Sequence, residues 1–324
     1  MCTAIFSPSG PHPYFGRNLD YECSFGESVA ITPRNSPLTF RALPTLPRHH
    51  ALIGMAHVVN RTALYYDATN EHGLSMAGLL FAGNAFYQKP DPNATNVASF
   101  ELIGYLLGQC TTVDEAEILL QQINVTDEAF SPDLPPSPLH WMLADRTRCV
   151  VIEALKDGLH VHENPVGVLA NNPPFPYQMT YLQHFSILSP KSPENRAFPS
   201  FNATPYSRGM GAIGLPGDLS SASRFVRAVF HLHHSVYPQD EIPAVNQFFR
   251  ILNTVYQTEG AVQVGTQLEK TVYTCCYNTD QGIYYYTTYE NPQITAVHLH
   301  REDLDGKFLI QYPLDKEHVV RQTN

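Results

Sequence analysis

A cysteine directly after the first methionine is the residue with the clearest chemical potential in this sequence. Loss of Met1 would leave Cys2 with a free α-amino group and a thiol on the same carbon skeleton. An α-amine titrates near pH ~8 and a thiol near ~8.5, so the amine can act as a base close to neutral pH. The pattern indicates an N-terminal nucleophile with its own proton acceptor. Taken alone, Cys2 is more simply a small buried residue that begins a strand.

Two charged residues, Arg17 and Asp20, are expected to return beside Cys2 in a hairpin. Residues 2–6 alternate apolar and polar types, which predicts a strand. Residues 7–11, Ser-Pro-Ser-Gly-Pro, predict a turn before the return strand. In such a hairpin Arg17 can hold a thiolate or a substrate carboxylate, and Asp20 can accept a hydrogen bond from the terminal amine. A surface ion pair or a turn cap is the alternative for both residues.

The start of the chain and six later motifs resemble one known family. They are MCTAI, FGRNLDYE and VAITPRN near the start, then NEHGLSMAGL (70–79), LHWM (139–142), GVLANNP (167–173), GLPGD (214–218), ASRF (222–225) and GIYYY (282–286). Together they resemble the choloylglycine hydrolases, the branch of the N-terminal nucleophile hydrolases that includes bile salt hydrolases and penicillin V acylases. The likeness covers nearly the whole chain, with the motifs in the family's order.

The resemblance implies roles for three residues outside the hairpin. Asn171 and the backbone amide of Leu80 would hold the oxyanion of an acyl-transfer reaction, where one donor is typically worth ~10²–10³ in rate. Arg224 would lie near Cys2. Leu80 departs from the family, because bile salt hydrolases commonly carry Asn and penicillin V acylases commonly carry Tyr at this place. Without the resemblance, Asn171 would be a turn residue ahead of Pro173, and Arg224 a solvated residue at a helix start.

The substrate pocket is expected to be apolar with an arginine at its mouth, which suits a steroid acid with an anionic tail. By analogy with the family's pocket loops, Leu19, Val58, Val59 and the loop 130–139 are candidates for its walls. Each of them could equally be ordinary packing. The triplet Ser-Arg-Gly around Arg208 resembles the type of enzyme that prefers glycine conjugates.

We therefore expect a cysteine amidohydrolase that cleaves glycine- or taurine-conjugated bile salts, with glycine conjugates preferred. Two alternatives stay open. The same chemistry could act on penicillin V or another N-acyl amide, since Leu80 does not separate the two substrate classes. The chain could also be a non-catalytic member of the family that binds apolar anions.

The elements that must position these residues follow one another as strands, two helices, strands, two helices and strands. Helices are predicted over 98–109, 112–123, 221–236 and 243–258, with a capping box at Thr112. Because hairpins outnumber strand–helix units, a Rossmann-type fold is excluded. We predict an α+β fold, an αββα sandwich of two antiparallel sheets flanked by helix pairs, and the resemblance implies the same. Residues 1–324 are expected to form one domain, with a long irregular stretch over 172–211.

Composition excludes several classes of function. The net charge of −10 argues against a nucleic-acid partner, and no apolar run is long enough to insert into a membrane. The six cysteines form no disulfide-like framework, so a cytoplasmic location is expected. His298 and His300 could share a strand face, but no carboxylate or thiol supports them, so no metal or other cofactor is expected. The resemblance implies a homotetramer, with the stretch 172–211 as a contact.

Overall fold

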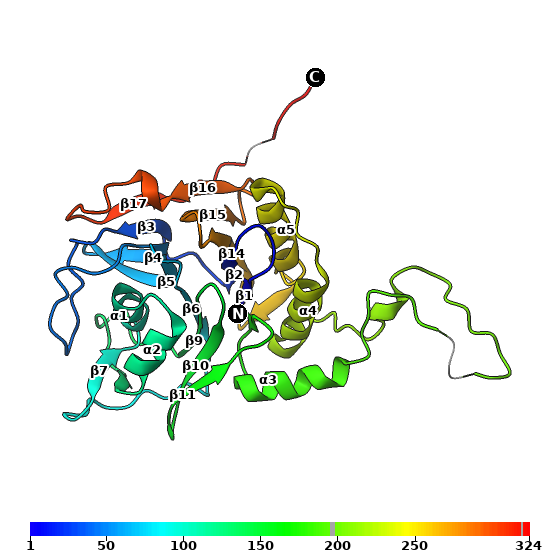
Figure 1. The fold of residues 1–324 in the computed structure, drawn as a ribbon, viewed down its shortest axis with the longest axis horizontal. Helices are drawn as coiled ribbons and strands as arrows, with labels where there is room; N and C mark the ends of the chain where they lie inside the picture. Colours follow the sequence, from blue (N-terminus) through cyan, green and yellow to red (C-terminus); the bar gives the residue numbers. More distant parts are fainter. Residues whose placement is uncertain (195–197, 319) are drawn as a thin grey trace.

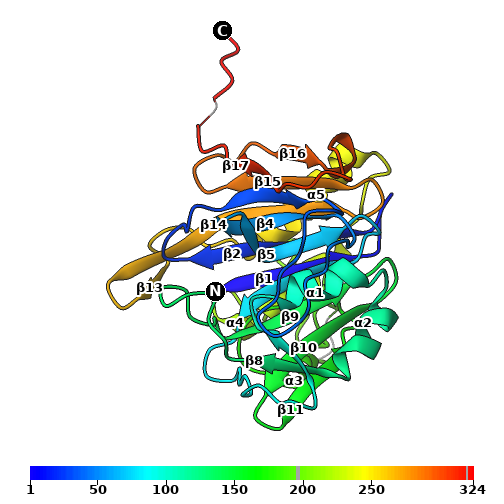
Figure 2. The same cartoon turned by 90° about the vertical axis from the view of Figure 1, so that its left-hand side faces the viewer.

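Two stacked antiparallel sheets form the centre of this computed structural model, which describes residues 1–194, 198–318 and 320–324. Among the described residues, the seven-stranded sheet has the order β12 (Val168–Leu169), β1 (Cys2–Ser7), β2 (Tyr14–Tyr21), β14 (Gln267–Asn278), β15 (Ile283–Thr288) and β16 (Thr295–His298), with β13 (Val262–Val264) beside β14. The eight-stranded sheet has the order β11 (Gly158–Glu163), β10 (Cys149–Leu155), β9 (Leu139–Ala144), β6 (Ser75–Leu80), β5 (Thr62–Asn70), β4 (Leu52–Val59), β3 (Ser28–Thr32) and β17 (Ile310–Pro313). A separate parallel pair joins β7 (Thr95–Ala98) and β8 (Ile123–Thr126). Figure 1 labels β7 and Figure 2 labels β8.

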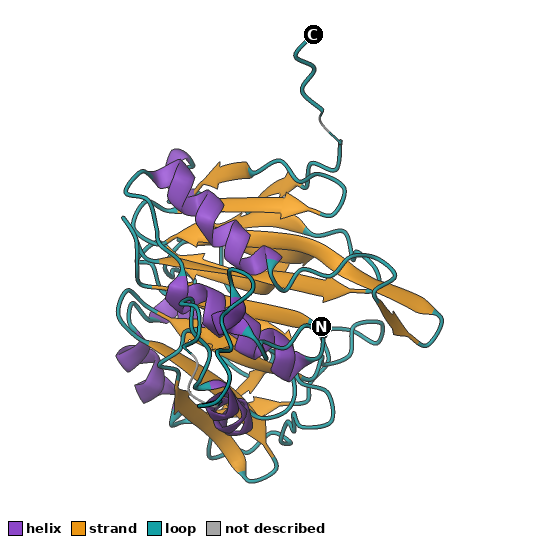
Figure 3. Cartoon of the chain, turned by 90° about the vertical axis from the view of Figure 1, so that its right-hand side faces the viewer, coloured by secondary structure: helices purple, strands orange, loops and turns teal. Residues whose placement is uncertain are grey.

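Helices cover the outer face of each sheet (Figure 1). Helices α1 (Leu102–Gln109) and α2 (Val113–Leu120) bury their apolar side chains against the eight-stranded sheet. Helices α4 (Ser221–His234) and α5 (Glu241–Asn253) lie across the seven-stranded sheet (Figure 3). This arrangement confirms the predicted αββα sandwich. No helix in the described part of the chain is both long and apolar enough to span a bilayer.

Several helices differ from their predicted bounds, and one helix was not predicted. Helix α1 begins at Leu102 rather than at residue 98, because residues 95–98 form strand β7. Helix α5 ends at Asn253, five residues earlier than predicted. The stretch 172–211, of which 195–197 lie outside the described residues, contains an unpredicted helix, α3 (Phe175–Leu182). Its prolines suggested a loop, but a proline is tolerated in the first turn of a helix, where its missing N–H would have no partner.

The predicted capping box at α2 is partly confirmed. The Thr112 hydroxyl accepts a hydrogen bond from the backbone N–H of Glu115 at 3.2 Å, as the motif requires. The Glu115 carboxylate, however, accepts from the backbone N–H of Thr111 at 2.6 Å rather than from Thr112. The cap therefore holds the turn that joins α1 to α2.

Strand β1 is buried on both faces, although its sequence alternates like a half-exposed strand. All six residues from Cys2 to Ser7 are buried. One face lies under α4, and the other faces the eight-stranded sheet, since β1 contacts both α4 and β6. Cys2 is therefore buried inside the sandwich rather than exposed at its surface.

We predict that Gly16→Ala strongly destabilises the protein. A Cβ on Gly16 in β2 would lie 2.0 Å from the Cys275 carbonyl oxygen and 2.9 Å from the Phe248 ring of α5. Because backbone cannot yield, we expect the free energy of unfolding to fall by about 3 kcal/mol in urea titrations. The matched control is Gly104→Ala in α1, where nothing lies within 4 Å. It should leave stability unchanged or raise it by up to about 1 kcal/mol, and equal losses in both variants would contradict this account.

Asp218 generates a pH-dependent prediction for the start of α4. Hydrogen bonds from the hydroxyls of Ser220 and Ser223 and from the Ser220 amide lower the pKa of Asp218 from 3.8 to about 2. A lowered folded-state pKa stabilises the fold above about pH 4, and this stabilisation is lost as the pH falls toward 2. We expect Asp218→Ala to cost about 1 kcal/mol at pH 7, with the difference from wild type narrowing below about pH 4. Asp218→Asn keeps an acceptor and should lose less; a pH-independent loss in Asp218→Ala would refute the assignment.

Candidate active site

The hairpin of β1 and β2 brings the predicted charged residues beside Cys2. Cys2 pairs with Leu19 across the hairpin, and Ala4 pairs with Arg17. The Cys2 side chain is buried, with 5% of its surface exposed. Leu19 is also buried and lies opposite Cys2 on the paired strand. Its role as a wall of the substrate pocket stays a prediction.

Arg224 ties three distant segments to this hairpin. Its guanidinium donates to the Cys2 carbonyl at 2.5 Å, to the Thr3 hydroxyl at 2.5 Å and to the Asn171 side-chain carbonyl at 2.7 Å, while Nε donates to Leu219 O at 3.0 Å. The side chain is fully buried. A cation is disfavoured in the first turn of a helix, and the structure shows what holds this one there: its charge is directed away from α4 and into the site.

Asp20 supplies a negative charge to the Arg224 guanidinium. The two side chains approach to 4.0 Å, and both are fully buried. The Asp20 carboxylate also accepts from the Thr271 hydroxyl at 2.7 Å and from Gln257 Nε2 at 3.2 Å. Burial raises the pKa of Asp20, and the charge of Arg224 and the Thr271 hydrogen bond oppose that rise. The pair therefore neutralises two buried charges beside the reacting end of the chain.

Arg17 is a second buried cation, and it has an unused donor. Its Nη1 donates to Gly78 O at 2.5 Å and to Tyr66 O at 3.2 Å, whereas Nη2 has no partner among the described residues. Burial by itself lowers the pKa of Arg17, but attraction from Cys2, Tyr273 and Asp67 outweighs burial and raises the pKa above its ordinary value. A buried guanidinium with a free N–H can bind a thiolate or a substrate oxygen.

Asn171 bridges Cys2 and Leu80. Its side-chain oxygen accepts from the Cys2 backbone nitrogen at 2.7 Å, and its Nδ2 donates to the Leu80 carbonyl at 2.7 Å. The structure therefore brings together all the residues that the sequence assigned to catalysis: Cys2, Arg17, Asp20, Leu80, Asn171 and Arg224. The roles assigned to Asn171 and to the Leu80 amide stay predictions, because in this arrangement Leu80 offers its carbonyl to Asn171.

A buried histidine–glutamate pair that sequence reasoning missed supports the backbone before Asn171. His140 Nε2 lies 2.8 Å from the Ala170 carbonyl and must donate to it, because a carbonyl only accepts. His140 Nδ1 lies 3.1 Å from Glu153, and both side chains are fully buried. Glu153 also accepts from the Phe175 backbone N–H at 2.9 Å, at the start of α3. The only signal was a histidine within a buried strand, which sequence alone assigns to packing.

Two further side chains fix the backbone of Asn171 itself. Gln178 of α3 donates to the Asn171 carbonyl at 2.6 Å, and the Asn171 N–H donates to the Ser221 hydroxyl at 2.8 Å. Gln178 is fully buried. Because α3 was not predicted, nothing in the sequence pointed to Gln178. Together with His140, these contacts leave the Asn171 side chain little freedom to move.

Met1 is present in the structure and is joined by a peptide bond to the Cys2 nitrogen, the atom expected to become the reacting amine. Its ammonium donates to Asp20 O at 2.6 Å and forms an ion pair with the buried carboxylate of Glu269. While Met1 is attached, the Cys2 nitrogen is an amide without basic character. Removal of Met1 would turn that nitrogen into an amine, already within hydrogen-bonding distance of Asn171.

The residues predicted to bind substrate are spread more widely. Val58 and Val59 are half-buried at the end of β4, and neither lines the apolar pocket of about 170 Å³ that lies beside them. Phe130 and Leu134, from the loop 130–139 that was predicted to form part of the pocket wall, do line that pocket. Arg208 is exposed on the segment between α3 and α4, which projects from the body of the molecule (Figure 1). The structure of one chain does not bring Arg208 to Cys2.

Histidines do not form the strand-face pair considered from the sequence. Strand β16 ends at His298, and His300 lies in the 3₁₀ turn that follows, so the two do not share a strand face. In the described part of the chain, one group of three side chains could hold a metal ion, namely His50, Glu71 and His72. The Glu71 carboxylate is already bound by the side chain of Arg34.

Comparisons with known proteins agree with this geometry. A family model described as linear amide C–N hydrolases, choloylglycine hydrolase family, matches residues 2–312. The bile salt hydrolase/transferase of Lactiplantibacillus plantarum is 49% identical over 318 residues, which are 98% of either chain. A solved structure of a mutant conjugated bile acid hydrolase from Clostridium perfringens has a TM-score of 0.92 at 32% identity and covers 100% of both chains.

A more distant structure shares the fold alone. Penicillin V acylase from Agrobacterium tumefaciens is 17% identical with a TM-score of 0.74, over 96% of this chain and 90% of that one. The fold is therefore common to proteins whose names give different substrates. The family model spans nearly the whole chain and the identity to curated relatives is high, so this protein belongs to the choloylglycine hydrolase family of linear amide C–N hydrolases.

Proposed function

We propose that this protein hydrolyses the amide bond of conjugated bile salts, releasing the bile acid and glycine or taurine, with Cys2 as nucleophile once Met1 is removed. The observation that carries the proposal is the convergence of Arg17, Arg224 and Asn171 on the buried Cys2. The names of the relatives from L. plantarum and C. perfringens support bile salts as the substrate class.

The reaction runs through a thioester. The Cys2 sulfur attacks the amide carbonyl carbon, and its proton passes to the Cys2 amine. The tetrahedral intermediate collapses, the C–N bond breaks, and the amine returns the proton to the departing amino acid. Water then gives a proton to the amine and attacks the thioester, which restores the thiol and releases the free acid.

The surrounding residues divide the work. Arg17 Nη2, which has no other partner in the described chain, would stabilise the thiolate or the substrate oxygen. The Asn171 side chain and the Leu80 backbone amide are proposed as oxyanion donors, with Asn171 also orienting the Cys2 amine that its oxygen already contacts. Arg224 holds the start of β1 through the Cys2 carbonyl, and Asp20 compensates the positive charge of Arg224. In these roles the last two position Cys2 and need not touch the substrate.

Two features of the substrate are narrower proposals. The apolar pocket suits the rigid steroid body of a bile acid. Penicillin V or another N-acyl amide is the alternative substrate, because Leu80 does not distinguish the two substrate classes. Preference for glycine conjugates is proposed only from the Ser-Arg-Gly triplet around Arg208.

We further propose that the protein is a homotetramer and works in the cytoplasm. The described residues of the segment 186–215 (186–194 and 198–215), here called the arm, project from the body (Figure 1). They carry exposed apolar side chains, including Ile187, Tyr206 and Ile213 at 85%, 89% and 64% exposure. Large apolar groups exposed together favour contact with another protein surface. A reducing compartment would keep the Cys2 thiol available, and all six cysteines are free.

Turnover of bile salts tests the proposed reaction. Protein whose N-terminus is shown by mass spectrometry to begin at Cys2 should release free acid from glycocholate and taurocholate faster than it releases phenoxyacetic acid from penicillin V. Cys2→Ala should lose all measurable turnover. Protein that retains Met1 should be equally inactive, because its Cys2 nitrogen is an amide. A preference for penicillin V would move the substrate to the alternative class.

Alkylation with iodoacetamide tests separately whether the Cys2 thiol is activated. Burial raises the pKa of Cys149, Cys275 and Cys276 well above the ordinary value, and raises that of Cys110 to about 12. With Met1 removed, iodoacetamide should therefore label Cys2 before these four thiols, as read by peptide mass. Labelling of Cys2 no faster than the buried thiols would count against an activated nucleophile.

Variants of the arm test the proposed assembly. Replacing Ile187, Tyr206 and Ile213 by serine together should convert the tetramer into smaller species in analytical ultracentrifugation, since the apolar contact surface is lost. The control is Ile118→Ser, an apolar residue of α2 that is 61% exposed on another face. It should leave the mass unchanged. Identical masses for wild type and the triple variant would exclude the arm as the contact.

A further inference from the structure

The eight-stranded sheet opens between β5 and β6, and the apolar pocket of about 170 Å³ lies at this opening. Strands β5 and β6 pair only between residues 67–69 and 75–77, and the end of β6 pairs with β9 alone. The first half of β5 therefore has no neighbouring strand on that side. Side chains from β5, β9, α1 and the loop before β9 line the pocket, so it lies between these two strands and α1.

Two residues connect this pocket with the active site. Tyr66 lines the pocket, and its backbone carbonyl accepts a hydrogen bond from Arg17. Leu139 also lines it and pairs in the sheet with Leu80, whose carbonyl is bound by Asn171. An acyl group attached at the nucleophile would therefore extend into the pocket, with its far end against β9 and α1.

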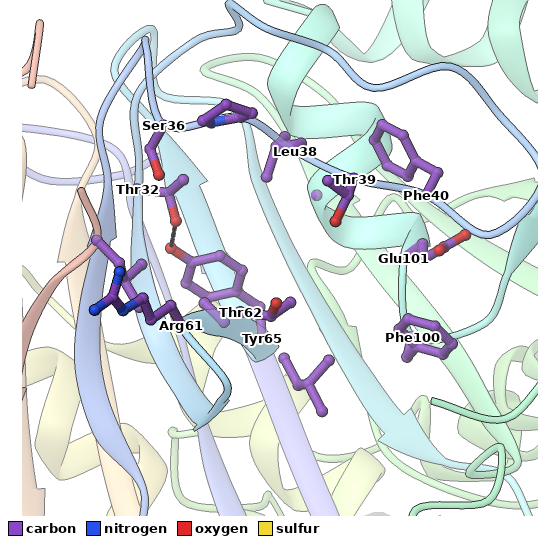
Figure 4. Close-up of a pocket in the computed structure, with 15 residues that line it drawn as sticks. Thr32, Ser36, Leu38, Thr39, Phe40, Arg61, Thr62, Tyr65, Phe100 and Glu101 are labelled. Carbon is purple, nitrogen blue, oxygen red and sulfur yellow. Dashed lines mark hydrogen bonds between the residues drawn. The ribbon is translucent and has the colours of Figure 1, made fainter. Parts of the chain in front are cut away.

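Two polar atoms among the residues that line this apolar pocket have no partner. They are Nδ1 of His57 and Nε1 of Trp141, both buried and without a hydrogen bond to any described residue. Trp141 is fully buried. The Tyr65 hydroxyl, by contrast, is bonded to Thr32 at 2.7 Å in the neighbouring hollow of about 70 Å³ (Figure 4), so Tyr65 offers the pocket its ring rather than its hydroxyl.

The two unpartnered buried atoms, His57 Nδ1 and Trp141 Nε1, indicate which polar group a ligand in this pocket must carry. Buried polar groups are nearly always hydrogen-bonded, and one left alone costs free energy. The indole N–H of Trp141 only donates, so it needs an acceptor on the ligand. A hydroxyl accepts from an indole and can donate to, or accept from, an imidazole nitrogen. An apolar ring body that carries a hydroxyl would satisfy both atoms while filling the rest of the pocket.

We propose that His57 and Trp141 are specificity-determining residues that hydrogen-bond to a ring hydroxyl of the acyl group, at the end remote from the scissile amide. The inference rests on the proposed function, because it assumes that the acyl group is a steroid. It adds that the pocket distinguishes hydroxylated from bare ring systems. A site built to bind a hydroxyl rejects an analogue without it far more strongly than an apolar site rejects a missing methylene.

The test measures binding, so it does not depend on catalysis. Calorimetry with Cys2→Ala protein would compare the glycine conjugate of cholic acid with that of 5β-cholanic acid, which has no ring hydroxyl. The ratio of the two dissociation constants is the readout. We expect His57→Leu and Trp141→Phe, each in the Cys2→Ala background, to reduce this ratio about tenfold or more. Phe130→Leu, an apolar wall residue, is the matched control and should weaken both ligands alike.

The outcomes separate the two proposals. An unchanged ratio in both variants, with both ligands still bound, would overturn the assignment of His57 and Trp141. Tight hydroxyl-dependent binding without bile salt turnover by the processed wild type would instead remove the proposed function and keep the pocket assignment. Circular dichroism establishes whether each variant is folded. If Trp141→Phe unfolds, His57→Leu alone tests the assignment.

Discussion

The buried guanidinium of Arg224 is the interaction on which the site depends. It joins the first strand, the end of β12 and the start of α4 through Cys2, Asn171 and Leu219. A buried charge is tolerated only when hydrogen bonds and an opposite charge compensate it, and Asp20 at 4.0 Å supplies that charge. Loss of either partner would leave the other uncompensated inside the protein, so the geometry around the nucleophile and the packing of α4 are stabilised by the same contacts.

The charge of Arg17 is compensated differently, and the difference supports the role that we propose for it. Its negative neighbours include Asp67, which accepts from the hydroxyls of Tyr273 and Tyr284 in the opposite sheet. These contacts bind the two sheets together below the site but leave Nη2 of Arg17 unpaired. Every nitrogen of the Arg224 guanidinium thus has a partner, whereas Arg17 keeps a donor for the role proposed above, binding charge that develops on the thiol or the substrate. One buried cation is structural, and the other is available for chemistry.

Sequence reasoning succeeded where contacts are local. The hairpin that places Arg17 opposite Ala4 requires only alternation, a dense turn and a return strand, and all lie within twenty residues. The helix pairs on both faces followed from their periodicity. Helix α3 was not predicted, because its prolines and short length are typical of a loop. Strand β17 was not predicted either, because Ile310–Pro313 forms a strand only by pairing with β3, which lies far away in the sequence. No local pattern carries such information.

The sequence by itself determined which chemical groups are available: a cysteine that can become the first residue, two arginines, an aspartate and an asparagine in recognisable motifs. Tertiary structure decided how they meet. Asn171 reaches Cys2 and Leu80 only because β12 pairs with β1, and because His140, Glu153 and Gln178 hold its backbone. The opening between β5 and β6 is likewise invisible in the sequence. Hydrogen bonds between residues more than a hundred positions apart depend on the closed sandwich, since short-range propensities cannot specify them.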